Sequence, residues 1–234
     1  MTWYEKSYKR LYKYRDKVST RYGVSLPLNP LFVGKGSMGV AYNIGNGLVL
    51  KVTDDDIEGE ASYLLSNKRT KYINHIYASF VVMKKPELLP EYFIIQDMLP
   101  GKINNKETEA VKFIMYLEWN FDTLDELNTL YKEIANNKPL SPGRASNYYE
   151  KAIKPHSKYN HKYFIKMLGF YVNAMNELRK YGIDYGDFRP NNVMKDKDGN
   201  YKIIDVGGGS NIKNHGIIDI IESKINEVKK TKTP

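Results

Sequence analysis

YGDFRPNNVMKDKDGNYKIID, residues Tyr185–Asp205, places three oxygen-bearing side chains around a predicted hairpin. Residues 192–196 and 201–204 have the pattern of two short strands, and Asp-Gly in the turn between them supplies the positive φ angles that tight turns need. The hairpin brings Asn192 and Asp205 to neighbouring strand ends, where their oxygens could hold a hard cation such as magnesium. Asp187 lies just upstream and can orient a nucleophile. The pattern predicts phosphoryl transfer.

The bulk composition limits the alternatives. A chain of 234 residues fits one domain of two lobes, or two small domains. Its net charge of +9 favours anionic partners such as nucleotides, nucleic acid or acidic surfaces. The chain has no cysteine, which excludes disulfides, thiolate zinc sites and a cysteine nucleophile. No apolar run approaches the roughly 18–20 residues of a membrane span. We therefore expect a cytoplasmic protein without membrane contact.

Residues 1–29 are predicted to form a basic, helical N-terminal extension. Apolar and aromatic side chains recur at three- and four-residue steps over 1–22, and basic residues outnumber acidic ones there. One interpretation is an arm that binds nucleic acid or a partner. The favoured interpretation is a helix that packs its aromatic stripe on the body of the protein, with a solvated basic face. Pro27 and Pro30 then disfavour a helix and form a connector.

A glycine-rich stretch follows, with Gly34, Gly36 and Gly39 in the order G-x-G-x-x-G. Such glycines let backbone amides approach phosphate oxygens closely. In a dinucleotide-binding fold the pattern would open a helix. Here strand-like residues 40–44 follow, then the turn 45–47 and a second strand over 48–52. The glycines therefore cap a β-hairpin, and the alternative is a glycine-rich turn without a ligand.

Lys51 lies inside an apolar strand, where a lysine is costly to bury without anionic partners. Nucleotide phosphates and a nearby carboxylate would be suitable anionic partners for this lysine. Glu60, on the helix predicted just after the strand, is the expected carboxylate, and Glu58 is its rival. A surface lysine on an edge strand is the remaining alternative.

The rest of the chain predicts more strand and then mainly helix. Strands are expected over 74–83 and 91–99, the second ending at a Pro-Gly break that suits a hinge. Apolar residues at helical spacing predict helices over 108–116, 124–134, 163–181 and 216–228. Residues 136–158, with several prolines, are expected to form a loop. The fold class expected is therefore α+β.

From about residue 31 to 207 these motifs resemble the signature set of the protein-kinase-like superfamily. The resemblance implies an ATP-binding site whose strand lysine is Lys51 and whose helix partner is Glu60. It implies that Asp187 is the catalytic base, that Arg189 contacts the γ-phosphate, and that magnesium is held by Asn192 and Asp205. The other implied nucleotide contacts are the glycine-rich loop and the hinge: Gly34, Lys35, Gly36, Ser37, Met38, Gly39, Gln96, Asp97 and Met98.

The resemblance also implies two lobes: a small antiparallel β N-lobe over 30–99 and a reduced, mainly helical C-lobe over 100–234. Several residues depart from the protein-kinase pattern. Tyr185 replaces the usual histidine, Val206 replaces a phenylalanine, and Gly186 matches the catalytic loops of aminoglycoside phosphotransferases and choline kinases. No Ala-Pro-Glu sequence follows Asp205. These departures put a peptide-binding platform in doubt.

The expected function is an ATP- and magnesium-dependent phosphotransferase, with a protein serine or threonine as the favoured acceptor. One alternative is a phosphotransferase for a small hydroxyl-bearing molecule, favoured by Gly186. Another is a kinase-shaped binding protein without turnover. Nucleic-acid binding through the basic N-terminal extension is possible on charge alone and is not favoured.

Overall fold

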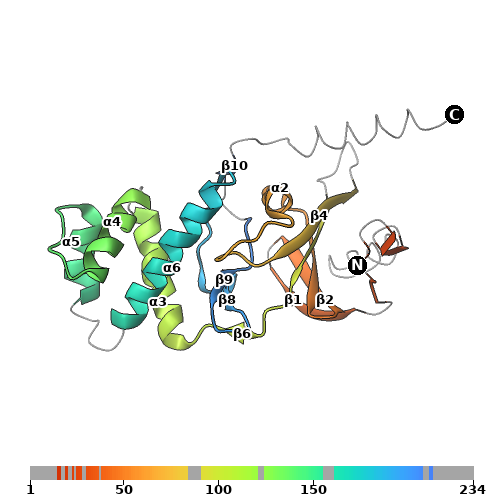
Figure 1. Ribbon diagram of the computed structural model, residues 1–234, viewed down its shortest axis with the longest axis horizontal. Coiled ribbons are helices and arrows are strands. Elements are labelled where there is room, and N and C mark those ends of the chain that lie inside the picture. The colour runs from red at the N-terminus through yellow and green to blue at the C-terminus, as the bar shows by residue number, and fades with distance from the viewer. Residues whose placement is uncertain are drawn as a thin grey trace.

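The computed structural model describes residues 15–16, 19–20, 23, 25–27, 30–36, 38–83, 91–120, 124–154, 161–207 and 211–212. Within these ranges the chain is α+β, as the sequence predicted. An antiparallel five-stranded sheet lies toward one end of the molecule and a group of helices toward the other (Figure 1). The helix expected over 216–228 lies outside the described residues, and the one expected over 1–22 is described only at 15–16 and 19–20.

The five-stranded sheet has the order β1-β2-β3-β5-β4. Its strands are β1 (Leu31–Lys35), β2 (Gly39–Gly45), β3 (Leu48–Thr53), β4 (Ile76–Met83) and β5 (Glu91–Asp97). The predicted hairpin between β2 and β3 is confirmed, and residues 45–47 of its turn have φ angles between 52° and 87°. Lys51 pairs in register with Ala41 on one side and Ile94 on the other. β3 is therefore an inner strand.

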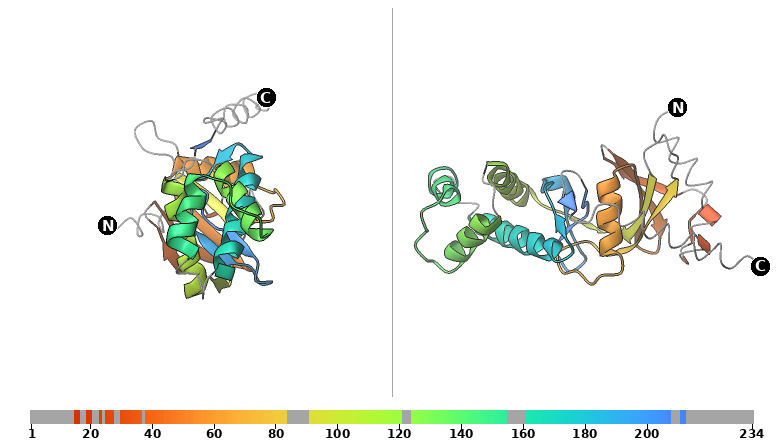
Figure 2. Two further views of the ribbon diagram at one scale, coloured as in Figure 1. Left: turned by 90° about the vertical axis from the view of Figure 1, so that its left-hand side faces the viewer. Right: turned by 90° about the horizontal axis from the view of Figure 1, so that it is seen from above.

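Helix α2 (Asp56–Leu65) packs on β4 and β5 (Figure 2). The helix begins where the Asp55 carboxylate accepts a hydrogen bond from the backbone N–H of Glu58. Gly59 sets how closely helix and sheet approach, because a Cβ atom there would lie 2.3 Å from the ring of Tyr92. Its carbonyl also accepts a hydrogen bond of 2.8 Å from the Ser79 hydroxyl. The helix position that presents Glu58 to the sheet is thus fixed by close backbone contact.

Substituting Gly59→Ala should lower the free energy of unfolding by about 1–3 kcal/mol, because the buried Tyr92 ring must move. At a solvent-exposed helix position the same change stabilises by up to about 1 kcal/mol. The sign of the change in unfolding free energy therefore shows whether Gly59 packs against Tyr92. Urea denaturation measures it. Gly34→Ala is the control, since a Cβ there meets nothing within 4 Å and its stability should be unchanged. A stabilised Gly59→Ala protein would contradict this packing.

The helical part is organised around α6 (His161–Arg179), which packs against α3 (Asn105–Asn120) and α4 (Leu124–Ala135). The predicted helix over 163–181 is thus confirmed. The loop expected over 136–158 is partly wrong, because α5 (Arg144–Tyr148) and the π-helical turn η1 (Tyr149–Ile153) occupy 144–153. The loop was expected because of its prolines. Pro139 and Pro142 precede α5, however, so they interrupt no helical hydrogen bond.

The hairpin over 192–204 is confirmed with shorter strands, β8 (Val193–Lys195) and β9 (Tyr201–Ile203). These pair with β6 (Gly101–Lys102) in a three-stranded sheet, while β7 (Ile183–Asp184) pairs with β10 (Asn211–Ile212). Asn192 ends the 3-10 turn η3 (Pro190–Asn192), just ahead of β8. The Asp196 carboxylate accepts hydrogen bonds from the backbone N–H groups of residues 198 and 200, which fixes the turn.

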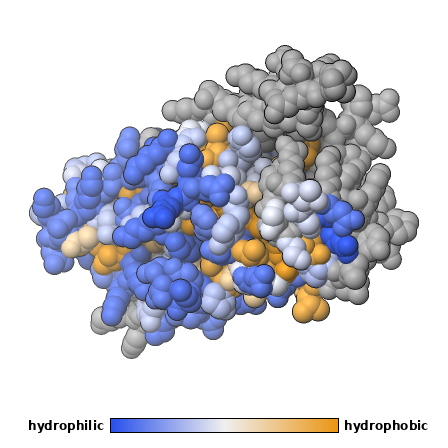
Figure 3. Space-filling model, turned by 45° about the vertical axis from the view of Figure 1, so that its right-hand side comes forward, coloured by the Kyte–Doolittle hydropathy of each residue, from blue (hydrophilic) through white to orange (hydrophobic). Residues whose placement is uncertain are grey.

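In the part of the chain that the structure describes, the core forms two hydrophobic clusters. One lies within the five-stranded sheet, and the other joins the helices to α2 and to the β8–β9 hairpin. This division is compatible with a two-lobed fold. On the face drawn in Figure 3 the surface is mostly hydrophilic, with hydrophobic residues gathered in a few patches. Within the described ranges, no helix has both the length and the apolar character required to cross a membrane.

Candidate active site

Lys51 joins the sheet to the hairpin. Its ammonium group donates hydrogen bonds to the Glu58 carboxylate on α2 and, at 2.7 Å, to Oδ2 of Asp205 just after β9. The Lys51 and Glu58 side chains keep only 14% and 4% of their surface exposed. Because β3 is an inner strand and the lysine side chain is largely covered, the alternative of a surface lysine on an edge strand is wrong. We call Lys51, Glu58 and Asp205 the ionic triad.

The carboxylate that pairs with Lys51 is Glu58, so the expectation of Glu60 is wrong. Helix α2 starts at Asp56, directly after β3 and its short connection, which puts Glu58 in the first turn facing Lys51. Glu60 lies roughly 200° further around the helix axis, since successive residues are about 100° apart. Glu60 is buried on α2 and takes no part in the triad.

A matched pair of variants tests this correction. Glu58→Gln should weaken ATP binding and phosphate transfer by about ten- to hundredfold, because the amide cannot neutralise and position the buried ammonium. Glu60→Gln should change both by less than about threefold. Calorimetry and a transfer assay measure the two quantities. A larger loss in Glu60→Gln than in Glu58→Gln would return the role to Glu60.

Burial and pairing act against each other in the ionic triad. Burial raises the pKa of Glu58 to about 7, and Lys51 offsets part of this effect. Burial alone would lower the pKa of Lys51, but the two carboxylates raise it above its ordinary value. Burial would likewise raise the pKa of Asp205, but Lys51 holds it below its ordinary value. Lys51 and Asp205 are therefore charged at neutral pH, and Glu58 is close to titration.

Asp187 is held by its neighbours on the loop between β7 and β8. Its backbone carbonyl accepts hydrogen bonds from the Tyr185 hydroxyl at 2.7 Å and from Nδ2 of Asn192 at 3.0 Å. Its carboxylate accepts a second bond from Asn192, at 2.8 Å, and forms an ion pair with Arg189. Asp187 and Asn192, five positions apart, are thus in direct contact, which the sequence did not predict.

Burial raises the pKa of Asp187, and Arg189 and Asn192 offset part of the rise. A raised pKa makes a carboxylate a better proton acceptor. Burial also raises the pKa of Tyr185 well above its ordinary value, so this hydroxyl stays neutral and donates to the Asp187 carbonyl. The sequence showed Tyr185 only as a departure from histidine. Its place two residues before Asp187 was the available signal for a positioning role.

Asn192 and Asp205 meet through the hairpin register. The backbone N–H of Ile204 donates to the Asn192 carbonyl at 3.0 Å, so Asn192 lies opposite the residue that precedes Asp205. Oδ1 of Asp205 accepts a hydrogen bond from the Gly207 N–H at 3.1 Å, and its side chain keeps 31% of its surface exposed. Among the described residues, no cluster of three or more acidic, histidine or cysteine side chains could hold a metal ion.

The donor set nevertheless has the right chemistry for magnesium. The amide N–H groups of Asn192 donate to Asp187, and its amide oxygen takes no part in that contact. That oxygen and the partly exposed carboxylate of Asp205 are hard donors, and they belong to residues at the paired ends of the β8–β9 hairpin. Magnesium ordinarily keeps several of its waters and needs only one or two protein oxygens, so these two side chains would be sufficient to hold it.

The glycine-rich loop lies against Lys51. Gly39 opens β2 beside β3, and a Cβ atom there would lie 2.9 Å from the Val52 carbonyl and 3.2 Å from Cε of Lys51. Gly36 donates its N–H to the Gly39 carbonyl at 2.8 Å, which closes the loop. Around Gly34 and Gly36 the space is open. Lys35 ends β1, Met38 is exposed, and Ser37 lies outside the described residues.

The hinge residues are more constrained than the sequence indicated. Gln96 and Asp97 end β5 and pair with β3 as far as Leu48. The backbone N–H of Asp97 donates to the His75 carbonyl at 3.1 Å, and that of Met98 donates to the Gly47 carbonyl at 2.7 Å. These N–H donors, expected to bind a base, are occupied in this structure. The first residues beyond them are 99–100, which lead into β6.

Glu118 on α3 is a partly buried acid that the sequence did not single out. Burial, aided by the nearby carboxylates of Asp187 and Asp184, raises its pKa to about 7, and the hydrogen bond with Tyr171 offsets part of the rise. The Tyr171 hydroxyl donates to its Oε1 at 3.2 Å. In the sequence, Glu118 lies just beyond the helix predicted over 108–116, and nothing there connects it with Asp187. Its nearness to Asp187 could therefore not be predicted.

Comparisons with known proteins leave the family open. No protein-family model matches the sequence, and no curated protein matches it. Among solved structures, the chain is similar to "High resolution (2.2 A) crystal structure of WbdD", with 15% sequence identity and a TM-score of 0.38. The match covers 85% of this chain but only 37% of that one. At this identity and TM-score the likeness establishes neither a shared family nor a shared activity.

Proposed function

We propose that this chain is a two-lobed, protein-kinase-like phosphotransferase that transfers the γ-phosphate of ATP to a hydroxyl group. The observation that carries the proposal is the ionic triad. Lys51 and Asp205 are 154 positions apart, yet Lys51 bonds Asp205 and Glu58 together in a buried setting. An ammonium group held this way, beside a glycine-rich loop, is suited to bind the phosphates of a nucleotide.

Each residue has a distinct task in this proposal. The open space around Gly34 and Gly36 lets phosphate oxygens approach the backbone of the loop, and Lys51 neutralises their charge. Asp187, positioned by Tyr185 and Asn192, accepts the proton of the acceptor hydroxyl. Arg189, which is 54% exposed, can turn from Asp187 to the transferred phosphate. Positioning and electrostatics supply most of the acceleration in phosphoryl transfer.

Magnesium would be held by the oxygens of Asn192 and Asp205. When bound, it would offset the negative charge that develops on the phosphate during transfer. Asp205 stays ionised because Lys51 lowers its pKa, so it remains able to bind a cation at neutral pH. Asn192 links the metal side of the site to Asp187 through its amide nitrogen.

The favoured acceptor is a protein serine or threonine. Arg189 and Pro190 fall where serine/threonine kinases carry Lys-Pro, and a net charge of +9 favours acidic partners. A small-molecule alcohol is the second candidate, supported by Gly186 in the catalytic loop.

The test is transfer from γ-labelled ATP with magnesium, followed in separate reactions to the protein itself, to mixed cell proteins and to small alcohols. Asp187→Ala is the control. Label that appears in serine or threonine only with the unsubstituted chain supports the favoured acceptor, and label in a small alcohol supports the second. No transfer above the control, despite ATP binding, would leave a kinase-shaped binding protein.

A further inference from the structure

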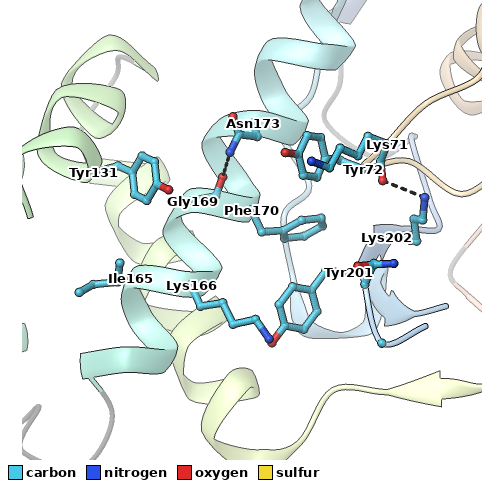
Figure 4. Close-up of a pocket in the computed structure, with 12 residues that line it drawn as sticks. Lys71, Tyr72, Tyr131, Ile165, Lys166, Gly169, Phe170, Asn173, Tyr201 and Lys202 are labelled. Carbon is cyan, nitrogen blue, oxygen red and sulfur yellow. Dashed lines mark hydrogen bonds between the residues drawn. The ribbon is translucent and has the colours of Figure 1, made fainter. Parts of the chain in front are cut away.

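A pocket of about 480 Å³ is lined by residues other than those of the candidate active site, and Figure 4 shows its lining. It is formed by α6, by Tyr131 of α4, by residues 71–72 ahead of β4, and by residues 199–202 at the start of β9. None of the residues of the ionic triad lines it, nor do Asp187 or Asn192. Its volume falls in the range of about 300–1,000 Å³ that is usual for small-molecule sites.

The pocket is positively charged. Lys71, Lys166 and Lys202 line it, and no acidic side chain does. Lys202 donates to the backbone carbonyl of Lys71 at 2.8 Å, and the Lys71 ammonium lies 5.3 Å from the centroid of the Tyr72 ring. Across the described part of the chain, none of the three forms an ion pair with a carboxylate. Three cations gathered around one hollow attract an anion.

The neighbouring carboxylates are directed to backbone groups. Glu177 accepts hydrogen bonds of 2.8–3.1 Å from the backbone N–H groups of Lys71 and Tyr72. Asp196 accepts from the backbone of the β8–β9 turn. Both carboxylates therefore fix the walls of the pocket rather than enter it.

The walls contain four aromatic residues, of which Tyr72 and Tyr131 are partly exposed and Phe170 and Tyr201 belong to the buried core. Phe170 lies 5.4 Å from the ring of Tyr201 and 6.1 Å from that of Tyr72, measured between ring centroids. Tyr131 approaches α6 at Gly169, where a Cβ atom would come within 2.7 Å of its ring. Lys166 stands over Tyr201, with its ammonium 4.6 Å from the ring centroid. Aromatic faces next to ammonium groups suit a ligand with both a planar ring and a negative charge.

We propose that this pocket binds a small aromatic phosphate of the nucleoside monophosphate class. The base stacks on the partly exposed rings of Tyr72 and Tyr131, and the phosphate lies among Lys71, Lys166 and Lys202. Two of its walls lead directly into the candidate active site, since α6 precedes the Tyr185 loop and β9 ends just before Asp205. The proposal rests on residues outside that site and stands whether or not the chain transfers phosphate.

Pyridoxal 5′-phosphate is the probe, because it carries an aromatic ring, a phosphate and an aldehyde. The aldehyde condenses with a lysine amine with loss of water, and borohydride reduces the imine to a stable secondary amine that peptide mass spectrometry locates. We expect Lys71, Lys166 and Lys202 to be labelled at least about fivefold more than Lys162, an exposed lysine on the same helix. AMP should protect the three lysines, whereas adenosine and ribose 5-phosphate should not.

Substitution provides the second readout. In the double variant Lys166→Gln/Lys202→Gln, AMP should no longer protect Lys71, and in the matched control Lys162→Gln it should still do so. The proposal is overturned if Lys162 is labelled as strongly as the pocket lysines, or if the label concentrates on Lys51. It is overturned equally if ribose 5-phosphate protects as well as AMP, or if protection survives in the double variant.

Discussion

The Asp187→Asn variant should transfer phosphate about 10²–10⁴-fold more slowly than the unsubstituted protein, with ATP affinity nearly unchanged. The amide has almost the same shape as the carboxylate and can keep contact with Asn192, but it cannot accept the proton of the acceptor hydroxyl. Because burial raises the pKa of Asp187, the unsubstituted protein should also gain activity as the pH rises through that pKa, and the variant should not. Rate measurements across pH, combined with ATP titration, test both statements.

Asp184→Asn is the matched control for this variant. Asp184 lies three positions before Asp187, is exposed, and pairs with Arg179 on the surface. Its substitution should change the rate by less than about twofold. Equal losses in the two variants, or an Asp187→Asn protein with full activity, would remove Asp187 from the proton-transfer role.

The Lys51→Met variant should lose phosphate transfer and also become less stable. Removing the ammonium leaves Glu58 buried and without its counter-charge, which typically costs about 3–5 kcal/mol in the free energy of unfolding. Asp205 contributes less to this loss, because 31% of its side-chain surface is exposed and solvent screens its charge. The fold should survive at moderate pH, because Glu58 can take up a proton.

The stability loss in Lys51→Met should depend on pH in a defined direction. The pKa of Glu58 is raised from 4.5 to about 7 in the folded protein, so folding favours its protonated form. The contribution of Glu58 to stability is complete below its unfolded pKa and is lost as the pH rises through its folded pKa. Methionine removes the lysine that lowers this pKa, so the deficit should grow between about pH 5 and pH 8.

Urea denaturation at several pH values measures this deficit. Lys102→Met is the control, because Lys102 is an exposed lysine on β6, outside the ionic triad. It should show no pH-dependent deficit. A Lys51→Met protein of unchanged stability at pH 8, or one with full transfer activity, would contradict the role of the ionic triad.

The sequence predicted the elements that have strong local signals. The hairpins at 45–47 and 197–200 depend on Asn-Gly and Asp-Gly turns, and α6 on a long apolar stripe. From these signals one can predict that Asn192 lies near Asp205 and that the glycine-rich loop lies near Lys51. In the structure, Asn192 pairs with the residue before Asp205, and Gly39 lies against Lys51. Turn chemistry and apolar periodicity are local, so they can be read from a single chain.

Features that depend on where an element starts could not be predicted in the same way. Glu58 and Glu60 are both on α2, and only the start of the helix after Asp55 decides which one faces Lys51. The occupied N–H groups of Asp97 and Met98 depend on how far β5 pairs with its neighbours. The 3-10 turn at Asn192 and the role of the Tyr185 hydroxyl likewise arise from tertiary contacts.

The central claim is that Lys51, Asn192 and Asp205 form a magnesium–nucleotide site, and calorimetric titration with ATP tests it most directly. The titration is run with and without magnesium on the unsubstituted protein and on Asp205→Asn. We predict that magnesium strengthens ATP binding at least about tenfold in the unsubstituted protein and has no such effect in the variant. An ATP affinity that is independent of magnesium in the unsubstituted protein, or no ATP binding at all, would contradict the claim.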